Sequence, residues 1–510
     1  MAVSAVPAPG LAKGAIGGVL WLTLSSGAQA LAQALALIIL ARLLVPEDFG
    51  VVGAAMIIVG FSTIFSQLGV GPAIVQRPSL EPRHLRVGFT LSTGLGALVA
   101  GLLWLTAPQI ASLFGMQRLE PVLGVVATIF FCQGVATVSD ALAQRHLRFR
   151  WLAMVDLASF VGGFLLVGAT MAWLGFGVWA MVGAHVTQNV LRAIALLTGQ
   201  PHPHRPLLER RTARELLYFG GGFTLARVGN YLAGQGDNLV VGRWLGAQAL
   251  GFYAQAYQLM VTPANLLGQA LDRVLFPSMA LVQFEPERLR RAYRAGIASV
   301  SVLLLPASLV LALLGPEIVL VLLGRKWSPA VVPFQILTLG LLFRTSYKLS
   351  DSICRATGAV YKRAARQWVF AAMVLFSSWI GQHAGLAGVA TGVLAAIVLN
   401  FTLMASLSLR LVEMRWAEFL GAHLPAVALS MAVVPPSWLL VDWLRAGGCP
   451  PILVLASTMC AMVAVTVSLC LLSPRLFLGA DASRILGELR NMLCRRSFRP
   501  RPQPPVLPDA

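Results

Sequence analysis

The chain carries little charge for its length. Of its 510 residues, 12% are charged and 57% are hydrophobic, and the mean hydropathy is +0.77. A soluble globular domain carries roughly 25% charged and 45–50% apolar residues. A water-facing fold cannot bury this much apolar surface, so the composition excludes a soluble protein and indicates an integral membrane protein.

The long apolar runs lack strand-like alternation of polar and apolar residues. A membrane barrel would need that alternation, whereas continuous runs of about 20 apolar residues are typical of spanning helices. We therefore predict an all-α membrane protein with 14 spans. The predicted spans are residues 17–41, 49–72, 87–106, 120–142, 152–173, 177–198, 215–240, 249–272, 296–314, 331–354, 367–383, 385–409, 419–441 and 451–472.

Chemical motifs are scarce as well. The six cysteines are scattered, with neither a CxxC pair nor a Cys/His spacing suited to zinc, so we expect no disulfide framework and no metal site. There is no phosphate-binding Walker loop, and no Ser/His/Asp arrangement or paired carboxylate cluster occupies a loop. The predicted outer loops reach only about 15 residues, too few to house the chemistry of a membrane polymerase or ligase. We predict no catalytic residues, no cofactor and no enzymatic activity.

Acidic residues are rare: 20 Asp and Glu against 39 Lys and Arg give a net charge of +19. Of the 39 basic residues, 28 fall in the termini and even-numbered loops, 6 in odd-numbered loops and 5 within spans. By the positive-inside rule this asymmetry puts both termini in the cytoplasm. We assign the basic face to anionic membrane lipids rather than to nucleic acid. Lys13 and the stretch SGAQA ending at Ala30 resemble a cleavable signal peptide, but the apolar run continues to Leu44, so we expect the first span to be retained.

The sequence contains a weak internal repeat. ARLLVPEDFG at 41–50 is echoed by GRWLGAQALG at 242–251, and three further echoes follow in chain order at offsets of 208, 211 and 210. We call the two ten-residue stretches the corners. The repeat predicts two six-helix lobes, residues 1–213 and 214–411, followed by two extra helices in 412–474 and a basic, Pro-rich cytoplasmic tail in 475–510. Because six is even, the lobes enter the membrane the same way round, related by a pseudo-twofold axis along its normal. The corner glycines are expected to permit a tight turn.

The stretch ARLLVPEDFGVVGAAMIIVGFSTIFSQLGVGPAIVQRP resembles the second-helix signature of the polysaccharide transporter family. These proteins are the Wzx-type lipid-linked oligosaccharide flippases of the multidrug/oligosaccharidyl-lipid/polysaccharide (MOP) superfamily, and the likeness is to the colanic-acid-type branch. Residues 229–283 resemble the family's seventh and eighth helices, and the likeness extends over about residues 15–410. The resemblance implies a two-lobed flippase in the bacterial inner membrane. It would move an undecaprenyl-pyrophosphate-linked oligosaccharide outward for exopolysaccharide, capsule or O-antigen synthesis, alongside polysaccharide polymerase and chain-length or export proteins.

Cations within spans are the candidate substrate ligands, since a charge inside the membrane is costly. Arginine binds pyrophosphate oxygens in pairs and lysine acts as a point charge. The candidates are Arg227, Arg344, Lys348, Arg192 and Arg273 within spans, Asn230 on the same helix face as Arg227, and Arg42 at the outer side. For Arg192, Arg273 and Lys348 the alternative is a side chain that snorkels to the head groups, and for Arg42 it is an anchor at the lipid interface.

Coupling to protons or sodium would need a carboxylate in or beside a span. The candidates are Asp156, Asp237 and Asp351. Asp351 has Lys348 close by as a partner, whereas Asp156 has none nearby in the sequence. The energy source therefore stays open between protons, sodium and the membrane potential.

Two alternatives to a flippase remain. A drug/cation antiporter of the same superfamily would favour acids over arginines within its spans, and this chain shows the reverse. A non-transporting scaffold of a polysaccharide assembly complex would tolerate loss of Arg227 and Arg344, whereas a flippase would not.

Overall fold

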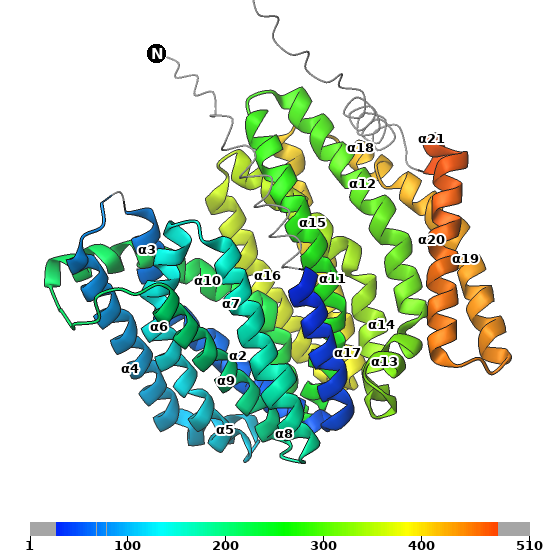
Figure 1. The fold of residues 1–510 in the computed structure, drawn as a ribbon. Helices are drawn as coiled ribbons and strands as arrows, with labels where there is room; N and C mark the ends of the chain where they lie inside the picture. Colours follow the sequence, from blue (N-terminus) through cyan, green and yellow to red (C-terminus); the bar gives the residue numbers. More distant parts are fainter. Residues whose placement is uncertain (1–26, 68, 78, 478–510) are drawn as a thin grey trace, which may run out of the picture. The chain divides into compact units, whose positions relative to one another are not determined.

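The computed structural model describes residues 27–67, 69–77 and 79–477, apart from the side chains of 67, 215–226, 266, 269–278, 360 and 475. Within these ranges every regular element is a helix (Figure 1). The predicted tail 475–510 and the start of the first predicted span lie almost wholly outside the described residues. The first described helix is Gly27–Leu43.

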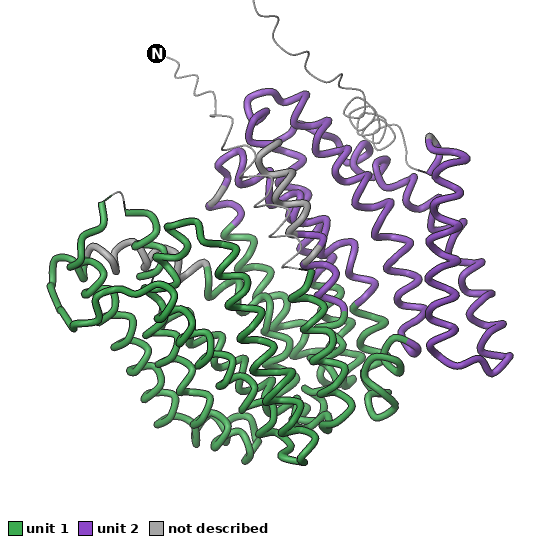
Figure 2. Tube along the Cα trace, in the orientation of Figure 1, with its two compact units in different colours: residues 1–259, 318–337, 364–396 green, residues 260–317, 338–363, 397–510 purple. Residues whose placement is uncertain are grey.

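Packing divides the chain into two compact units (Figure 2). Unit 1 comprises residues 1–259, 318–337 and 364–396, and unit 2 comprises 260–317, 338–363 and 397–510. This division differs from the two predicted lobes, because unit 1 includes two segments of the second repeat. The lobe boundaries therefore stay a prediction.

The elements of the first repeat all belong to unit 1. They are α2 (Pro46–Gln67), α3 (Val70–Gln76), α4 (Pro82–Phe114), α5 (Leu119–Val126), α6 (Thr128–Arg145), α7 (Phe149–Phe160), the π-helical η1 (Val161–Gly168), α8 (Ala169–Trp173) and α9 (Val178–Gly199). Helix α4 shows how the sequence sets an end: Pro82 stands in its first turn, and the Glu81 backbone N–H donates to His84 Nδ1 at 3.0 Å. The sequence predicts that this span ends at residue 106, but the helix continues to Phe114. It accommodates Pro108 in its interior and is terminated by Gly115, whose φ is 65°.

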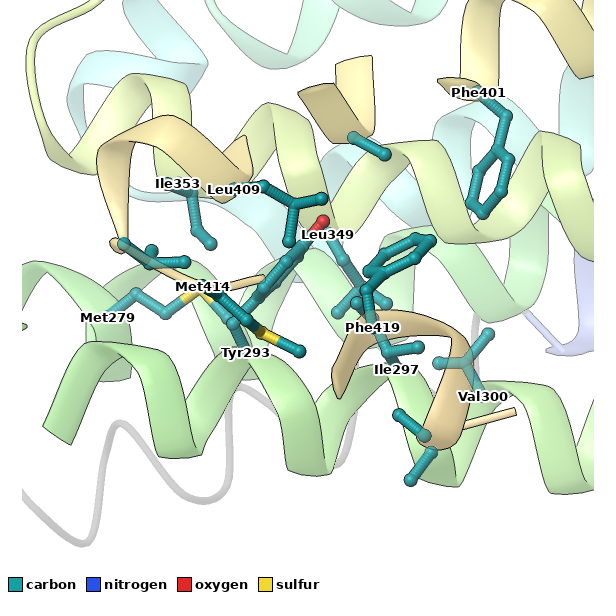
Figure 3. Close-up of a cluster of buried hydrophobic side chains, with 14 of the residues drawn as sticks. Met279, Tyr293, Ile297, Val300, Leu349, Ile353, Phe401, Leu409, Met414 and Phe419 are labelled. Carbon is teal, nitrogen blue, oxygen red and sulfur yellow. The ribbon is translucent and has the colours of Figure 1, made fainter. Parts of the chain in front are cut away.

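The remaining elements begin with α10 (Arg210–Trp244) in unit 1. They continue with α11 (Gly246–Leu281), α12 (Pro286–Leu313), α13 (Gly315–Leu322), η2 (Arg325–Ala330), α14 (Val331–Leu339), α15 (Leu341–Ala356), α16 (Val360–Gly381), η3 (Gln382–Ala384), α17 (Gly385–Leu411), α18 (Trp416–Gly421), α19 (Leu424–Ala446), α20 (Pro451–Leu472) and α21 (Pro474–Phe477). Unit 2 has a core in which Tyr293 and Phe419 pack with Leu349 and Phe401 (Figure 3). Tyr293 also places its hydroxyl 2.8 Å from Ser350 Oγ, which satisfies its buried polar atom.

Nine helical stretches in the described residues are long and apolar enough to cross a membrane, or ten if the bent pair Arg325–Leu339 and Leu341–Ala356 counts as one. The sequence predicts 14 spans. One of the nine, Tyr361–Leu411, has 51 residues and covers two predicted spans. Helices also occupy the predicted spans at Gly27–Leu43, α10 and α11. The chain is thus an all-helical, multi-span membrane protein, and the count of 14 stays a prediction.

The two corners pack against each other within unit 1. A Cβ on Gly50 would lie 2.5 Å from the Ala247 carbonyl carbon, and one on Gly251 would lie 2.8 Å from the Pro46 carbonyl carbon. The contact is reciprocal, because Pro46 and Ala247 are related by the same offset of 201 as Gly50 and Gly251. The prediction that the corner glycines permit a turn is confirmed for Gly246, whose φ is 87° at the junction of α10 and α11. It is wrong for Gly50 and Gly251, which lie inside α2 and α11, where the missing side chain allows two backbones to touch.

Each corner is also covered by a segment of the opposite repeat. Phe114, at the end of α4, lies against the second corner, since a Cβ on Gly242 would be 3.1 Å from its Cε1. Trp327, in η2, lies against the first corner and donates its indole N–H to the Ala41 carbonyl at 2.9 Å. The covering is therefore crossed: a residue of the first repeat, Phe114, covers the second corner, and a residue of the second repeat, Trp327, covers the first corner.

The segment between α9 and α10 is fastened to helices of the first repeat. The Leu207 backbone N–H donates to Thr90 Oγ1 at 2.9 Å, and Arg86 Nε donates to the Arg205 carbonyl at 3.0 Å. His202 is buried and lies 3.1 Å from Ser139 Oγ through its Nδ1. We call residues 200–209 the linker strap.

Candidate functional site

The contact between α2 and α10 positions the first candidate, Arg227. One turn further along α10, Tyr231 donates its hydroxyl to the Ile57 carbonyl of α2 at 2.6 Å, and its ring covers Gly60. Arg227 shares that helix face but is exposed, and no described side chain forms a hydrogen bond or ion pair with its guanidinium. Asn230 is exposed beside it. The contact to α2 thus holds α10 at Tyr231 and leaves an accessible cation one turn away.

Arg192 on α9 is held between two carboxylates. Its Nε donates to Asp156 Oδ1 of α7 at 2.7 Å, and its Nη2 donates to Asp140 Oδ2 of α6 at 3.3 Å. The three side chains are 24–37% exposed. The cluster therefore carries one negative charge in excess when both carboxylates are ionised, and it ties three helices together.

Asp237 on α10 is the most buried of the three coupling candidates, with 1% of its surface exposed. Its Oδ2 accepts a hydrogen bond from the Tyr253 hydroxyl of α11 at 2.9 Å, and its Oδ1 accepts one from the Asn238 backbone N–H at 2.9 Å. Asp237 thus joins α10 to α11 through a buried hydrogen bond.

The second-repeat candidates lie in unit 2. Arg344 and Lys348 are half-buried on α15, one turn apart. The Lys348 side chain lies over Gly268 of α11, where a Cβ would be 2.8 Å from its Cε. Asp351 pairs with Arg355 Nε at 3.2 Å and also with Arg363, so its ion pairs lie one turn along α15 and on α16.

The remaining candidates are Arg42 and Arg273. Arg42 is exposed and donates from Nη2 to the Val321 carbonyl at 2.7 Å. This hydrogen bond joins the first corner to α13 of the second repeat. The side chain of Arg273 lies outside the described residues.

The structure thus brings Arg192 together with Asp156, and sets Arg227 beside Asn230 on one face. Sequence reasoning missed Trp327, which is fully buried although it stands in a predicted loop. It also missed Tyr253 as the partner of Asp237. Only the aromatic character of these two residues could have signalled buried roles.

Comparison with known proteins gives the family. Residues 39–332 match the family described as polysaccharide biosynthesis protein. Lipopolysaccharide biosynthesis protein WzxC of Escherichia coli (strain K12) is 25% identical over 372 residues, which are 71% of this chain and 74% of WzxC.

Solved structures agree on the fold. Lipid II flippase MurJ, in its inward closed conformation, matches with a TM-score of 0.74 and 13% identity over 90% of this chain and 99% of the other. An inward-facing multidrug resistance MATE family transporter of the MOP superfamily matches with a TM-score of 0.62 and 17% identity over 76% and 94%. The chain belongs to the polysaccharide biosynthesis protein family and has the fold of the MOP-superfamily transporters.

Proposed function

We propose that the protein flips a polyprenyl-pyrophosphate-linked oligosaccharide from the cytoplasmic to the outer leaflet of the bacterial inner membrane by alternating access. It would have 14 spans, both termini in the cytoplasm, and two lobes, residues 1–213 and 214–411, related by a pseudo-twofold axis. The reciprocal contact of the corners is the observation that carries this proposal.

A reciprocal contact is what a twofold axis produces. When residue i of one copy touches residue j of the other, residue j of the first must touch residue i of the second. Pro46 touching Gly251, and Gly50 touching Ala247, satisfy this relation at one offset. Both corners are outer loops by the charge distribution, so their contact corresponds to a state closed on the outer side.

An outer-closed state would receive its substrate from the cytoplasm. In the predicted topology, in which α10 begins in the cytoplasm, Arg227 would lie on the cytoplasmic side of the contact between Tyr231 and α2, and its guanidinium is exposed. A membrane-embedded cation is costly unless it meets an anion, and pyrophosphate supplies about two negative charges. Arg344 and Lys348 would be the corresponding cations of the second repeat. The polyprenyl chain would stay in the lipid.

Coupling would depend on a carboxylate that changes its protonation state. Asp237 is buried and joins α10 to α11 by accepting a hydrogen bond from the Tyr253 hydroxyl, so a change of its protonation state would act on a contact between two helices; Asp351 is instead paired with two arginines. Asp156 is held by Arg192.

The test is export in a bacterium that lacks its own flippase, with surface polysaccharide and stranded lipid-linked precursor both scored. Arg227→Ala and Arg344→Ala should strand the precursor at matched expression. Arg243→Ala is the control. Arg243 lies at the end of α10, away from Arg227, and its Cζ is 5.6 Å from the centroid of the Trp244 ring. Normal export by both arginine variants would refute a role for these two cations in substrate binding and favour a scaffold. A wild type that exports drugs but no precursor would favour the antiporter.

A further inference from the structure

We propose that the predicted outer end of the first repeat carries a binding site for a neutral pyranose ring, formed by the starts of α2, α5 and α9. The inference rests on the proposed function, since the sugar would belong to the glycan delivered to the outer side. The site is a hollow of about 370 Å³ lined by Asp48, Arg118, Pro121 and residues 175–179. Ligand pockets fall in the range of about 300–1,000 Å³.

Two aromatic side chains form one wall of the hollow. Phe176 and Trp179 both line the hollow, and they remain 53% and 37% exposed, so their rings are accessible to a ligand. The turn between α8 and α9 contains Phe176 and is bent by Gly175 and Gly177 on either side of it, whose φ values are 82° and 56°. The apolar face of a pyranose packs on aromatic rings, and Trp and Tyr side chains combine apolar area with a polar edge.

A carboxylate and a guanidinium form the polar part. Asp48 is 6% exposed, and a Cβ on Gly177 would lie 3.6 Å from its Oδ2, so the carboxylate faces the glycine. Arg118 is exposed at the rim, where its Nη1 lies 3.8 Å from Glu47 Oε1. A carboxylate accepts hydrogen bonds from sugar hydroxyls, and a guanidinium donates to them.

Charge favours a neutral ligand over an anion at this hollow. Helices α2, α5 and α9 begin there, but the N–H groups of Asp48, Trp179 and Ala180 already donate to the carbonyls of Val45, Phe176 and Gly177 at 3.0–3.2 Å. An anion would meet the guanidinium of Arg118 but also the carboxylates of Asp48 and Glu47, which repel it. A neutral sugar, whose hydroxyls both donate and accept, satisfies both kinds of partner.

The aromatic pair could instead serve as an anchor at the membrane interface, and the chain offers a control for that role. Trp173, on α8, is 77% exposed and does not line the hollow. An anchoring role would be shared by Trp173 and Trp179. Sugar binding, by contrast, would depend on Trp179 and not on Trp173.

The experiment is saturation-transfer difference NMR on the purified full chain in detergent, with glucose and galactose as separate probes and inorganic pyrophosphate as the competing anion. The wild type should transfer saturation to the sugar ring protons. Asp48→Asn and Trp179→Ala should raise the Kd about tenfold or more, the loss of one charged hydrogen bond or one aromatic face. Trp173→Ala should bind like the wild type, and Trp179→Phe should retain part of the signal, which separates a lost site from a lost fold.

No signal from either sugar, an equal signal in all variants, or binding of pyrophosphate alone would each overturn the inference. Binding is read without transport. A wild type that binds sugar but fails to export precursor would therefore refute the proposed function and leave this site standing.

Discussion

Replacing a corner glycine by alanine should open the outer contact without unfolding the protein. A Cβ on Gly50 would lie 2.5 Å from the Ala247 carbonyl carbon and 3.0 Å from its Cα. Carbon atoms in contact lie about 3.5–4.0 Å apart, and the Ala247 carbonyl oxygen would be nearer still to the added Cβ, so the two backbones must separate by more than about 1 Å. Neither partner atom can rotate away, because both belong to the backbone of α11.

The size of the effect follows from this overlap. Overpacking a tight contact costs about 1–3 kcal/mol, which corresponds to a shift of about 5- to 150-fold in a two-state equilibrium. The same substitution within a helix gains about 0.5–1 kcal/mol of helix stability. The closed state therefore loses population while the helices themselves are preserved. Because one separation relieves both overlaps, Gly50→Ala and Gly251→Ala together should cost less than the sum of the two.

Gly53 provides the matched control on the same helix. A Cβ there would meet Leu250 Cδ2 at 3.7 Å, an ordinary contact. The assay places a cysteine at Ala54, which is fully buried one turn after Gly50, in a chain whose native cysteines are removed. A membrane-impermeant maleimide added from outside should label it about 5- to 150-fold faster in the Gly50→Ala background. Equal labelling in the Gly50→Ala and Gly53→Ala backgrounds would refute the reasoning.

Three further outcomes are expected. Asp237→Asn should make precursor flipping in proteoliposomes insensitive to a proton gradient, and a preserved response would exclude this carboxyl as the coupling group. Asp156→Asn should lower stability by only about 1 kcal/mol in thermal unfolding, because Arg192 keeps its second carboxylate and both side chains are partly exposed. Burial and the neighbouring His204 lower the pKa of His202 to about 4, below its ordinary 6.5. Neutral His202 therefore stabilises the packed linker strap fully above pH 6.5, and this stabilisation is lost as the pH falls towards 4. Hydrogen exchange at the Leu207 amide, corrected for its intrinsic rate, should rise roughly tenfold between pH 7.5 and 5.5, and His202→Gln should abolish that rise.

Composition and apolar run length were enough to predict the helical class, and the residue pattern placed a polar face on α10. They could not supply contacts between distant segments. Arg192 and Asp156 stand 36 residues apart, so their ion pair depends on how α7 packs against α9. Asp156 looks alone in the sequence for this reason.

Trp327 and Gly50 show the same limit in two other forms. A tryptophan in a predicted loop is expected to be exposed, yet Trp327 is buried because its indole finds a carbonyl 286 residues earlier in the chain. A glycine near a predicted turn is expected to relieve backbone strain. Gly50 instead serves a close approach that only the partner segment defines.

The crossed covering of the corners explains why packing assigns residues 318–337 to unit 1. The helix Gly27–Leu43 ends with carbonyl groups that lack partners within the helix. Lys326 donates to the Arg42 carbonyl at 3.0 Å and to the Leu44 carbonyl, and Trp327 donates to Ala41. The second repeat therefore caps the last helical turn before the first corner.

These bonds set the scale of the energy that holds the outer side closed. The three caps and the bond from Arg42 to Val321 are four hydrogen bonds, each worth about 0.5–1.5 kcal/mol net because water replaces the partner on opening. Together they contribute about 2–6 kcal/mol. Reversing a two-state equilibrium from 1:99 to 99:1 needs about 5.5 kcal/mol of differential binding. In the proposed function, a contact of this strength would populate one state in the absence of substrate and would still be weak enough for one bound lipid-linked anion to reverse it.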